Sequence, residues 1–542
     1  MFLAFAYAEE ETEEIGETGD EEILVLDDVE VKERLSGGNL GKTEIPRELL
    51  KNMPKGDGTV SDLLRVAPSV QYDLNYRSSG TAGEIAPAEV SISGGKTYEN
   101  LFLVDGMSNS NMLDPGSDIP VSSFENIGGN PQKFFIDSWL IEDITLHDSN
   151  ISAAYGDFTG GVVEVKTKNP GSKFGGKLSY KTTRSGWSHY YVDPRDREYF
   201  NKSEEPALQP NFKKDIYTAS LSIPINADTG ILASYNRTES IIPLGYFREY
   251  RDTERLSETY FLKAVYNING SSYIDASAAY SPYTGRYFLQ DHIDGDFELN
   301  GGGYSGIANY HLETEGRGEI KVHADYSFQE NSRTKSKDYH MAWIASKFKP
   351  WGAGASEDYT SNTPSYEGGP GNIDKENGAF SLKFDHSLGE FSYLGEHKLS
   401  YGAAYNYIFG RHHRTEPSSY YIYSTASLDV NCAGDSFTCV DGDQYFALRR
   451  YYPASDVYAQ VNEYAVYAED EWKFSRLKLR AGARVSGDDY MGNINIAPRT
   501  QLQWDIFDDN ATLLTVGYSR YYGANLLANK LREGMVPSVE TV

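Results

Sequence analysis

The sequence predicts a mostly β protein, with a small α+β domain over residues 40–170 and an antiparallel transmembrane β-barrel over residues 171–542. Three observations predict it: strands that alternate apolar and polar residues, a composition with 42 Tyr, and the lack of any apolar run near the roughly 18 residues that a spanning helix needs. Tyr suits the edges of an apolar surface because its ring is apolar and its tip is polar. Since barrel strands alternate, they look soluble on average, and the hydrophobic content of 39% fits this. Composition alone would also fit a soluble all-β protein.

The alternation is clearest in two neighbouring runs. In residues 477–485 apolar side chains alternate with basic residues and Gly482, and in residues 463–474 apolar and aromatic side chains alternate mainly with charged ones. Asp470 interrupts the apolar side of the second run. Because the two runs meet at Ser475, we expect an antiparallel hairpin with a tight turn.

Residues 217–225 and 260–266 repeat this alternation, and polar stretches around residues 331–375 and 409–455 separate other strands. Short turns at one end and long loops at the other are typical of outer-membrane barrels. A soluble sandwich would seldom place so many aromatic and small residues on one face of so many strands. We therefore favour the barrel.

The α+β fold of the first domain is predicted from short helices and strands that turn-forming residues separate. Helices are expected at residues 46–51, where Pro46 suits a helix start, and at residues 61–65. Strands are expected at residues 90–92, 101–104, 141–146 and 161–167.

The N-terminal residues predict export and an extended tether. Residues 1–8 end in Ala6-Tyr7-Ala8, as in a signal-peptide cleavage site, although the first lysine is Lys32. We interpret them as a signal-peptide remnant rather than a chance apolar run. Residues 9–39 begin with an acidic stretch that self-repels, which predicts a flexible tether. The β-prone runs that follow, at 23–26 and 29–31, suit either a recognition strand for a partner's sheet edge or a first domain strand.

The charge and the cysteines restrict the function. A net charge of -29 argues against a nucleic-acid partner. Cys432 and Cys439 stand among polar, turn-forming residues, which predicts a disulfide loop in an oxidising compartment and not a metal site. Gly95-Lys96-Thr97 lacks the upstream glycine of a P-loop, and His412 with His413 has no carboxylate at metal-ligand spacing. We expect no enzyme activity, no cofactor and no metal.

A series of motifs resembles the TonB-dependent outer-membrane receptor family. Residues 26–34 resemble the TonB box and its exit, residues 45–54 the following helix, and residues 61–70, with Asp62, Leu63, Leu64 and Pro68, the "DLLRxxPGV" element of the plug domain. The further plug matches are residues 90–95, residues 101–106 with Asp105 and Gly106, residues 141–146, Tyr155 with Gly156, and residues 160–168 with Gly160 and Gly161. In the barrel, residues 463–472 are similar to "YALYxQDEW", and residues 479–484, 497–499 and 514–523 resemble the strands that follow. Each match is weak alone, and their order makes the resemblance specific.

The resemblance implies energised import of a scarce nutrient, a small molecule or an oligomer, across the outer membrane of a Gram-negative bacterium. It implies that TonB, with ExbB, ExbD and the proton-motive force, would act from the periplasm, which the plug and N-terminus face, and that lipid surrounds the barrel. The TonB box would comprise Ile23, Leu24, Val25, Leu26, Asp27, Asp28, Val29, Glu30 and Val31, in a register centred on residues 23–26 or 28–31. The alternative is a non-transporting surface adhesin or assembly protein on the same scaffold.

Two departures and one shortfall stand out. The family usually has Arg-Gly where this chain has Ser93-Gly94, and often where it has Asp148-Ser149; those arginines are associated with plug contacts to the barrel wall. About 14 strands are expected, whereas plugged transporters close with about 22. Because an open sheet edge in lipid leaves unpaired backbone groups, we expect the chain to be part of a longer barrel.

Overall fold

The computed structural model describes residues 41–73, 76, 78, 80–114, 119–202, 208–247, 249–314, 316–351, 364–509, 512–523 and 526–541. The signal remnant, the tether and the TonB box that the sequence predicts all lie outside the described residues.

The plug domain is built on a five-stranded sheet with the order β1-β6-β7-β4-β5. Its strands are β1 (Lys42–Ile45), β6 (Ile141–His147), β7 (Val162–Thr167), β4 (Leu101–Val104) and β5 (Met107–Ser108), and a separate pair is formed by β2 (Val70–Tyr72) and β3 (Val90–Ile92). The helices are α1 (Arg47–Asn52) and α2 (Val60–Leu63), with 3-10 turns η1 (Leu64–Val66), η2 (Thr97–Glu99) and η3 (Ser138–Leu140). The helices and the strands β3, β4, β6 and β7 coincide closely with those expected from the sequence, whereas β1, β2 and β5 were not expected.

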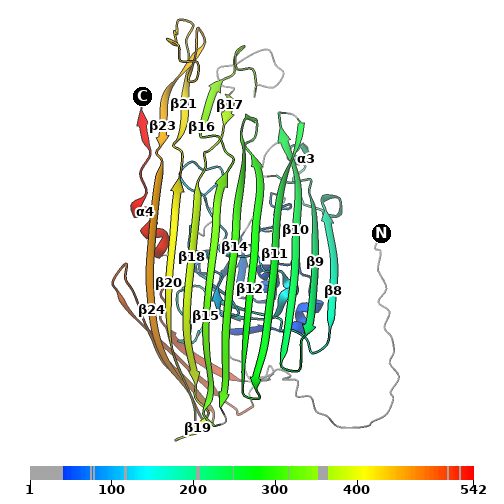
Figure 1. The fold of residues 1–542 in the computed structure, drawn as a ribbon, viewed down its shortest axis with the longest axis vertical. Coiled ribbons are helices and arrows are strands. Elements are labelled where there is room, and N and C mark those ends of the chain that lie inside the picture. Colours follow the sequence, from blue (N-terminus) through cyan, green and yellow to red (C-terminus); the bar gives the residue numbers. More distant parts are fainter. Residues whose placement is uncertain are drawn as a thin grey trace, which may run out of the picture. The chain divides into compact units, whose positions relative to one another are not determined.

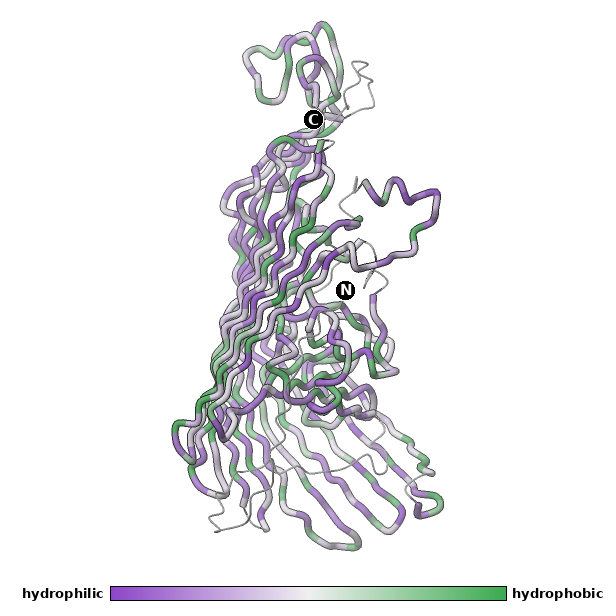
Figure 2. The backbone as a smooth tube through the Cα atoms, turned by 90° about the vertical axis from the view of Figure 1, so that its right-hand side faces the viewer, coloured by the Kyte–Doolittle hydropathy of each residue, from purple (hydrophilic) through white to green (hydrophobic). Residues whose placement is uncertain are grey.

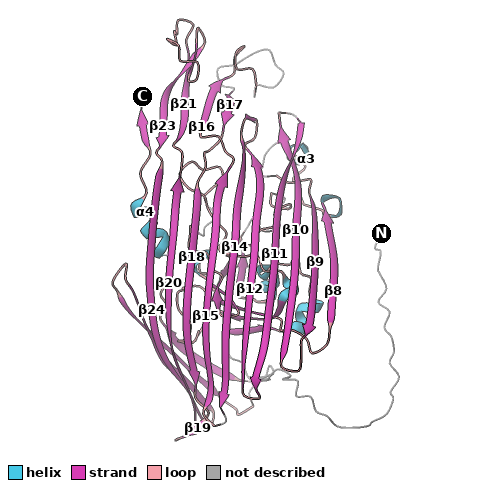
Figure 3. Ribbon diagram, viewed as in Figure 1, coloured by secondary structure: helices cyan, strands magenta, loops and turns pink. Residues whose placement is uncertain are grey.

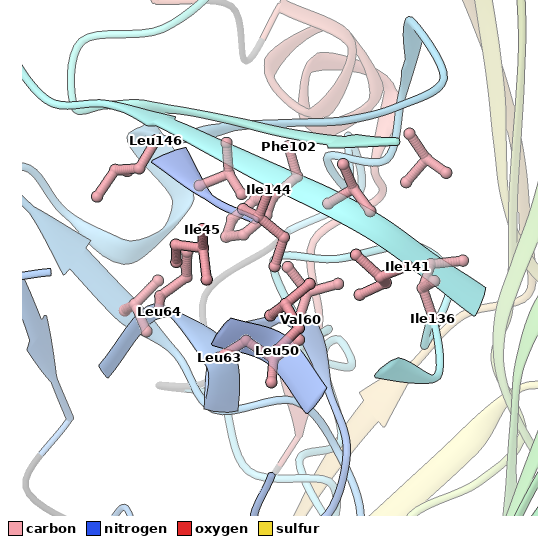
Figure 4. Close-up of a cluster of buried hydrophobic side chains, with 14 of the residues drawn as sticks. Ile45, Leu50, Val60, Leu63, Leu64, Phe102, Ile136, Ile141, Ile144 and Leu146 are labelled. Atoms are coloured by element: carbon pink, nitrogen blue, oxygen red, sulfur yellow. The ribbon is translucent and has the colours of Figure 1, made fainter. Parts of the chain in front are cut away.

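The "DLLR" residues shape the start of α2 and the plug core. The Thr59 side chain accepts a hydrogen bond from the Asp62 backbone N–H, and the Asp62 carboxylate accepts one from the Thr59 N–H, so the helix begins with a reciprocal cap. Leu63 and Leu64 are fully buried in the cluster that Figure 4 shows under β6. Pro68 lies in the exposed turn that follows.

A long antiparallel sheet follows the plug domain (Figures 1 and 3). In sheet order its strands are β27 (Leu513–Ser519), β26 (Ile494–Asp505), β25 (Leu477–Asp488), β24 (Ser455–Phe474), β20 (Glu396–Arg414), β18 (Asp374–Ser387), β15 (Gly318–Thr334), β14 (Asp296–Thr314), β12 (Ser272–Phe288), β11 (Glu249–Asn269), β10 (Thr229–Tyr246), β9 (Lys213–Pro224) and β8 (Gly175–Arg184), with β19 (Phe391–Ser392) paired to β20. Green and purple alternate along these strands in Figure 2, as expected for two faces in different surroundings. Among the described residues β8 and β27 are the two ends of the sheet, which is not closed.

The predicted hairpin at Ser475 is confirmed. Phe474 of β24 pairs with Leu477 of β25, and Ser475 adopts a φ of 52° in the turn between them. Asp470, which interrupts the apolar side of β24, accepts a hydrogen bond from His397 on β20 at 2.7 Å between Nδ1 and Oδ2. The charge on the outer face therefore has a partner on the neighbouring strand.

The long polar stretches are not simple loops, because they contribute most of a second, seven-stranded sheet. Its strands are β13 (His292–Ile293), β17 (Pro364–Gly368), β16 (Tyr339–Ile344), β21 (Ser418–Ala426), β23 (Gln444–Tyr452), β22 (Cys439–Val440) and β28 (Val539–Thr541). Most of them are labelled at the top of Figure 1. Cys432 and Cys439 form a disulfide, with 5.6 Å between their Cα atoms.

The remaining helices are short. They are α3 (Arg197–Lys202), α4 (Leu526–Gly534) and the 3-10 turn η4 (Ser185–Trp187). Among the residues that the structure describes, no helix has the length and apolar character to cross a membrane.

The outer face of β24 gives a test of the membrane assignment. Val466 is 55% exposed and lies on the same face as Tyr458 and Trp472, about midway between them. An arginine at the bilayer midplane of a barrel costs about 2–4 kcal/mol. We therefore expect Val466→Arg to lower the free energy of unfolding by this amount in denaturant titrations of the protein in lipid vesicles. Met491→Arg, at a site 55% exposed between β25 and β26, is the control and should cost little; equal losses in both variants would contradict the assignment.

Candidate functional site

The turn between β4 and β5 contains the Asp-Gly motif and lies against the strands of the barrel wall. Asp105 and Gly106 have φ values of 47° and 92°, a backbone conformation that favours Gly and tolerates Asp. A Cβ on Gly106 would also lie 3.0 Å from the His323 ring. The carbonyl of Gly106 accepts a hydrogen bond of 2.6 Å from Lys383 Nζ on β18. The motif thus forms a turn that touches two strands of the wall.

Lys263 on β11 is the charge partner of this turn. Its side chain is 4% exposed, and Nζ lies 3.3 Å from Asp105 Oδ2. The same ammonium donates to Thr167 Oγ1 at 3.0 Å and lies 3.9 Å from Asp275 of β12. Since a buried cation needs a partner and hydrogen bonds, this arrangement holds β4 and β7 of the plug against β11.

A second contact joins the plug loop at Glu84 to β11. Arg255, 2% exposed, binds both oxygens of Glu84, at 2.9 Å from Nε to Oε2 and 3.1 Å from Nη2 to Oε1. Gln209 Nε2 adds a hydrogen bond to the same carboxylate at 2.9 Å. Burial alone would raise the pKa of Glu84, but the charge and hydrogen bonds of Arg255 and the hydrogen bond of Gln209 hold the pKa below its ordinary value.

A third set of contacts joins β18 and β15 of the long sheet to plug residues 114 and 121–127. Lys375 Nζ on β18 lies 3.1 Å from Asp114 Oδ2 and donates to the carbonyl of Ile127 at 2.6 Å. Arg333 on β15 is fully buried, and its Nη1 donates to the carbonyls of Val121 and Ser123 at 2.8 and 2.7 Å. Plug residues 121–127 are therefore fixed to the wall through backbone carbonyls, and Asp114 is fixed through its carboxylate.

The closing plug motif is held by barrel side chains that bind its backbone. The Ala153 N–H donates to Glu469 Oε2 at 2.9 Å, and Arg484 Nη1 donates to the Ala154 carbonyl at 3.1 Å. Arg480 donates to the Asn150 carbonyl and Arg499 to that of Tyr155. We call plug residues 150–155, with these contacts, the backbone seat.

The predicted motif residues around the seat have separate local roles. The Tyr155 hydroxyl donates to Glu164 Oε2 at 2.7 Å inside the plug. A Cβ on Gly156 would lie 2.4 Å from Arg484 Nε, so a larger residue there would force that guanidinium to shift. Gly160 and Gly161 pack against Asn100, whose Oδ1 accepts from the Gly161 N–H at 3.0 Å.

The two departures from the family pattern lie side by side in the plug. Ser93 Oγ donates to the Asp148 carbonyl at 2.7 Å. The arginines of the backbone seat come instead from β25 and β26 of the barrel. Sequence reasoning did not single out Lys263, Arg255 or Lys375; their only signal is a charged residue on the inward face of an alternating strand.

One void between the plug sheet and the strands of the wall is small. A void of about 20 Å³ lies among apolar side chains of the plug and of β11, β12 and β14, including Val104, Phe134, Phe261 and Ile307. Such a volume holds about one water molecule. At this level the plug packs closely against the strands.

Comparison with known families decides the identity. The family model described as "TonB-dependent Receptor Plug Domain" matches residues 41–163, and "TonB dependent receptor-like, beta-barrel" matches residues 259–532, about half of the chain. The chain belongs to the TonB-dependent receptor family. The resemblance noted in the sequence is thus confirmed.

The receptor is similar to solved structures and to one curated protein. The curated protein is YddB of Escherichia coli, which is 28% identical over 510 residues, 91% of this chain and 60% of YddB. It carries the description of an uncharacterized protein, and its crystal structure is described as that of an outer membrane transporter. Its structure has a TM-score of 0.77 at 25% identity, with 91% of this chain and 62% of that chain covered. The chain therefore spans about three fifths of the length of this relative.

Two more distant structures share the fold. The ferric enterobactin receptor PfeA of Pseudomonas aeruginosa has a TM-score of 0.57 at 16% identity, covering 91% of this chain and 64% of that one. The siderophore receptor PirA of Acinetobacter baumannii has a TM-score of 0.56 at 16% identity, covering 90% and 62%.

The Glu84–Arg255 pair gives a prediction with a pH dependence. We expect Glu84→Ala to destabilise the docked plug of the receptor by about 3–5 kcal/mol, because it leaves Arg255 buried without a counterion, and Glu84→Gln to cost less. The pKa of Glu84 is lowered in the folded state, so the pair's contribution is present above pH 4.5 and is lost as the pH falls through the lowered pKa.

Protease access to the plug at increasing denaturant, measured at pH 7 and pH 3, tests this. The difference between wild type and Glu84→Gln should shrink at pH 3. A difference that stays constant with pH would contradict the prediction.

The contact at Gly156 gives a second prediction. Gly156→Ala should destabilise the docked plug by about 1–3 kcal/mol, because the new Cβ overlaps Arg484. Gly171→Ala, whose Cβ would meet nothing closer than 3.5 Å, is the matched control. The same protease assay compares them, and equal behaviour of the two variants would show that Arg484 moves aside freely.

Proposed function

We propose that this receptor imports a scarce nutrient, a small molecule or an oligomer, across the outer membrane of a Gram-negative bacterium. The observation that carries the proposal is a folded plug that several wall charges hold by contacts made at separate points of its chain. Such a plug would block passage while it is docked, and its contacts lie at separate points of its chain, so they could be broken in turn. The similar protein YddB of Escherichia coli is described as an outer membrane transporter, which supports the proposal.

In the proposed orientation the plug and the N-terminus face the periplasm. TonB, driven by ExbB, ExbD and the proton-motive force, would bind the TonB box at residues 23–31 as an added strand, chiefly through backbone hydrogen bonds. Because β1 is the first plug strand and lies at the edge of its sheet, a pull on the preceding chain acts first on the β1–β6 ladder, from Lys42–His147 to Ile45–Ile144.

The order of the chain then suggests how force could reach the wall contacts. Ile45, at the end of β1, is fully buried in the plug core. Removing it from the core exposes the cluster that α1 and α2 cover and loosens the plug sheet that presents Asp105 to Lys263. Opening by partial unfolding of the plug needs no movement of the barrel strands.

Deletion of residues 22–32 tests the assignment of the box. We expect energised uptake to be abolished while ligand binding to cells stays unchanged, because the deletion removes the TonB strand and leaves the described plug intact. Deletion of residues 10–20, within the acidic tether, is the control and should leave uptake near wild type. Uptake that survives loss of residues 22–32 would contradict the box.

The alternative function, a surface adhesin or assembly protein, has no need of TonB. A peptide spanning residues 20–35 should bind the periplasmic domain of TonB if the receptor is a transporter. No observation on the described residues favours the alternative.

A further inference from the structure

The second sheet consists of two halves that come from different parts of the chain. One half contains β13, β17 and β16, within residues 292–368, and the other contains β21, β23 and β22, within residues 418–452. A parallel ladder of three residue pairs between β16 and β21, centred on His340 and Tyr420, joins the halves (Figure 1). We call this ladder the seam.

A plug side chain lies against the seam and contacts both halves. The Phe124 ring stacks on Tyr420 of β21, with 4.7 Å between the ring centroids and 16° between the ring planes. It also stacks on Tyr452 of β23 at 5.8 Å and meets the His340 ring of β16 at 5.5 Å and 90°. Stacked and edge-to-face arrangements at these distances are favourable for aromatic pairs. Phe124 therefore binds one ring of the first half and two rings of the second.

The backbone around Phe124 is fixed by two buried arginines of the long sheet. Arg414, at the end of β20, donates from Nη2 to the Phe124 carbonyl at 2.5 Å. Arg333 of β15 holds the neighbouring carbonyl of Ser123 at 2.7 Å. Both guanidinium groups are buried, and hydrogen bonds to charged donors are stronger than those between neutral groups. The position of the Phe124 ring at the seam therefore depends on the position of plug residues 121–127.

Other contacts across the seam belong to the sheet itself. Gln444 of β23 donates from Nε2 to the Ile344 carbonyl and accepts from the Ile344 N–H at Oε1, both at 2.8 Å. The rings of Trp343 and Phe446 lie 4.3 Å apart. These contacts stay in place when the plug moves, because both partners are strand residues of the second sheet. Of the contacts named here, only those of Phe124 depend on the plug.

We infer that Phe124 couples docking of the plug to closure of the seam. A docked plug supplies the ring that both halves bind, and withdrawal of residues 121–127 removes that ring and weakens the junction. Because such coupling is reciprocal, a closed seam favours the docked plug by the same factor. Phe124 is thus a positioning residue that joins the second sheet to the plug. The inference concerns an equilibrium within the purified protein and does not rest on the proposed transport function.

Hydrogen exchange of the purified protein in detergent, followed by mass spectrometry, measures the seam directly. Phe124→Ala should accelerate exchange of the backbone amides of β16 and β21 at least tenfold. Phe135→Ala is the matched control, because Phe135 is a plug phenylalanine whose ring meets Tyr283 of β12 at 5.6 Å; it should leave exchange in β16 and β21 within twofold of wild type. Phe124→Leu keeps the apolar bulk without the ring and should accelerate exchange at least threefold, so it serves if Phe124→Ala does not fold, as judged by heat-modified migration on gels.

The reciprocal effect separates coupling from a merely structural role. Gln444→Ala weakens the seam from within the sheet and should accelerate exchange in plug residues 121–127 at least threefold. In the Phe124→Ala background the same substitution should leave those residues unchanged, because their link to the seam is already lost. Seam exchange that stays at the wild-type rate in folded Phe124→Ala or Phe124→Leu protein would overturn the inference. So would an effect of Gln444→Ala on the plug that is absent in the wild-type background or equal in both backgrounds.

Discussion

The inward charges of the barrel wall are the constraint on which the rest of the structure depends. Each strand presents one face outward and the other to the plug, so Lys263, Arg255 and Lys375 are placed in a buried interface. A buried charge is costly unless it is paired. Each of these cations forms an ion pair with a plug carboxylate, and the three carboxylates, Asp105, Glu84 and Asp114, come from different segments. Forming all three pairs together restricts where the plug can dock against the wall.

These ion pairs determine the position of the docked plug more than they increase its stability. Replacing a buried ion pair by apolar residues often leaves a protein as stable as before, whereas removing only one partner of the pair costs several kcal/mol. Ion pairs therefore fix where the plug sits more than they add to its total stability. The apolar core of the plug, around Leu63, Leu64 and Ile144, lies mainly within the domain itself. Other apolar plug residues, such as Leu113 and Leu140, pack in clusters with barrel side chains, and these contacts are lost when the domain leaves the wall.

The sequence predicted those features that depend on local pattern. Period-two alternation identified the hairpin at Ser475, and the Asp105-Gly106 pair predicted a turn. Alternation gives the face of a residue and not its partner, so it could not pair Lys263 with Asp105, 158 residues away. The polar stretches looked like loops because their strands are stabilised by aromatic contacts between remote segments, such as His292 with Tyr366. The TonB box lies outside the described residues and stays a prediction.

The backbone seat has a consequence for how this surface changes during evolution. Glu469, Arg480, Arg484 and Arg499 bind amide and carbonyl groups of residues 150–155, which every amino acid except proline supplies in full. Side chains such as those of Ala153 and Ala154 are not what the barrel recognises. Packing constrains the side chains of this segment, as at the fully buried Ile151 and Ala153, but these hydrogen bonds do not, so compensating changes between their barrel donors or acceptors and the plug side chains need not arise here. Methods that infer contacts from correlated substitutions would be blind to this junction, even though it is one of the places where plug and barrel are joined.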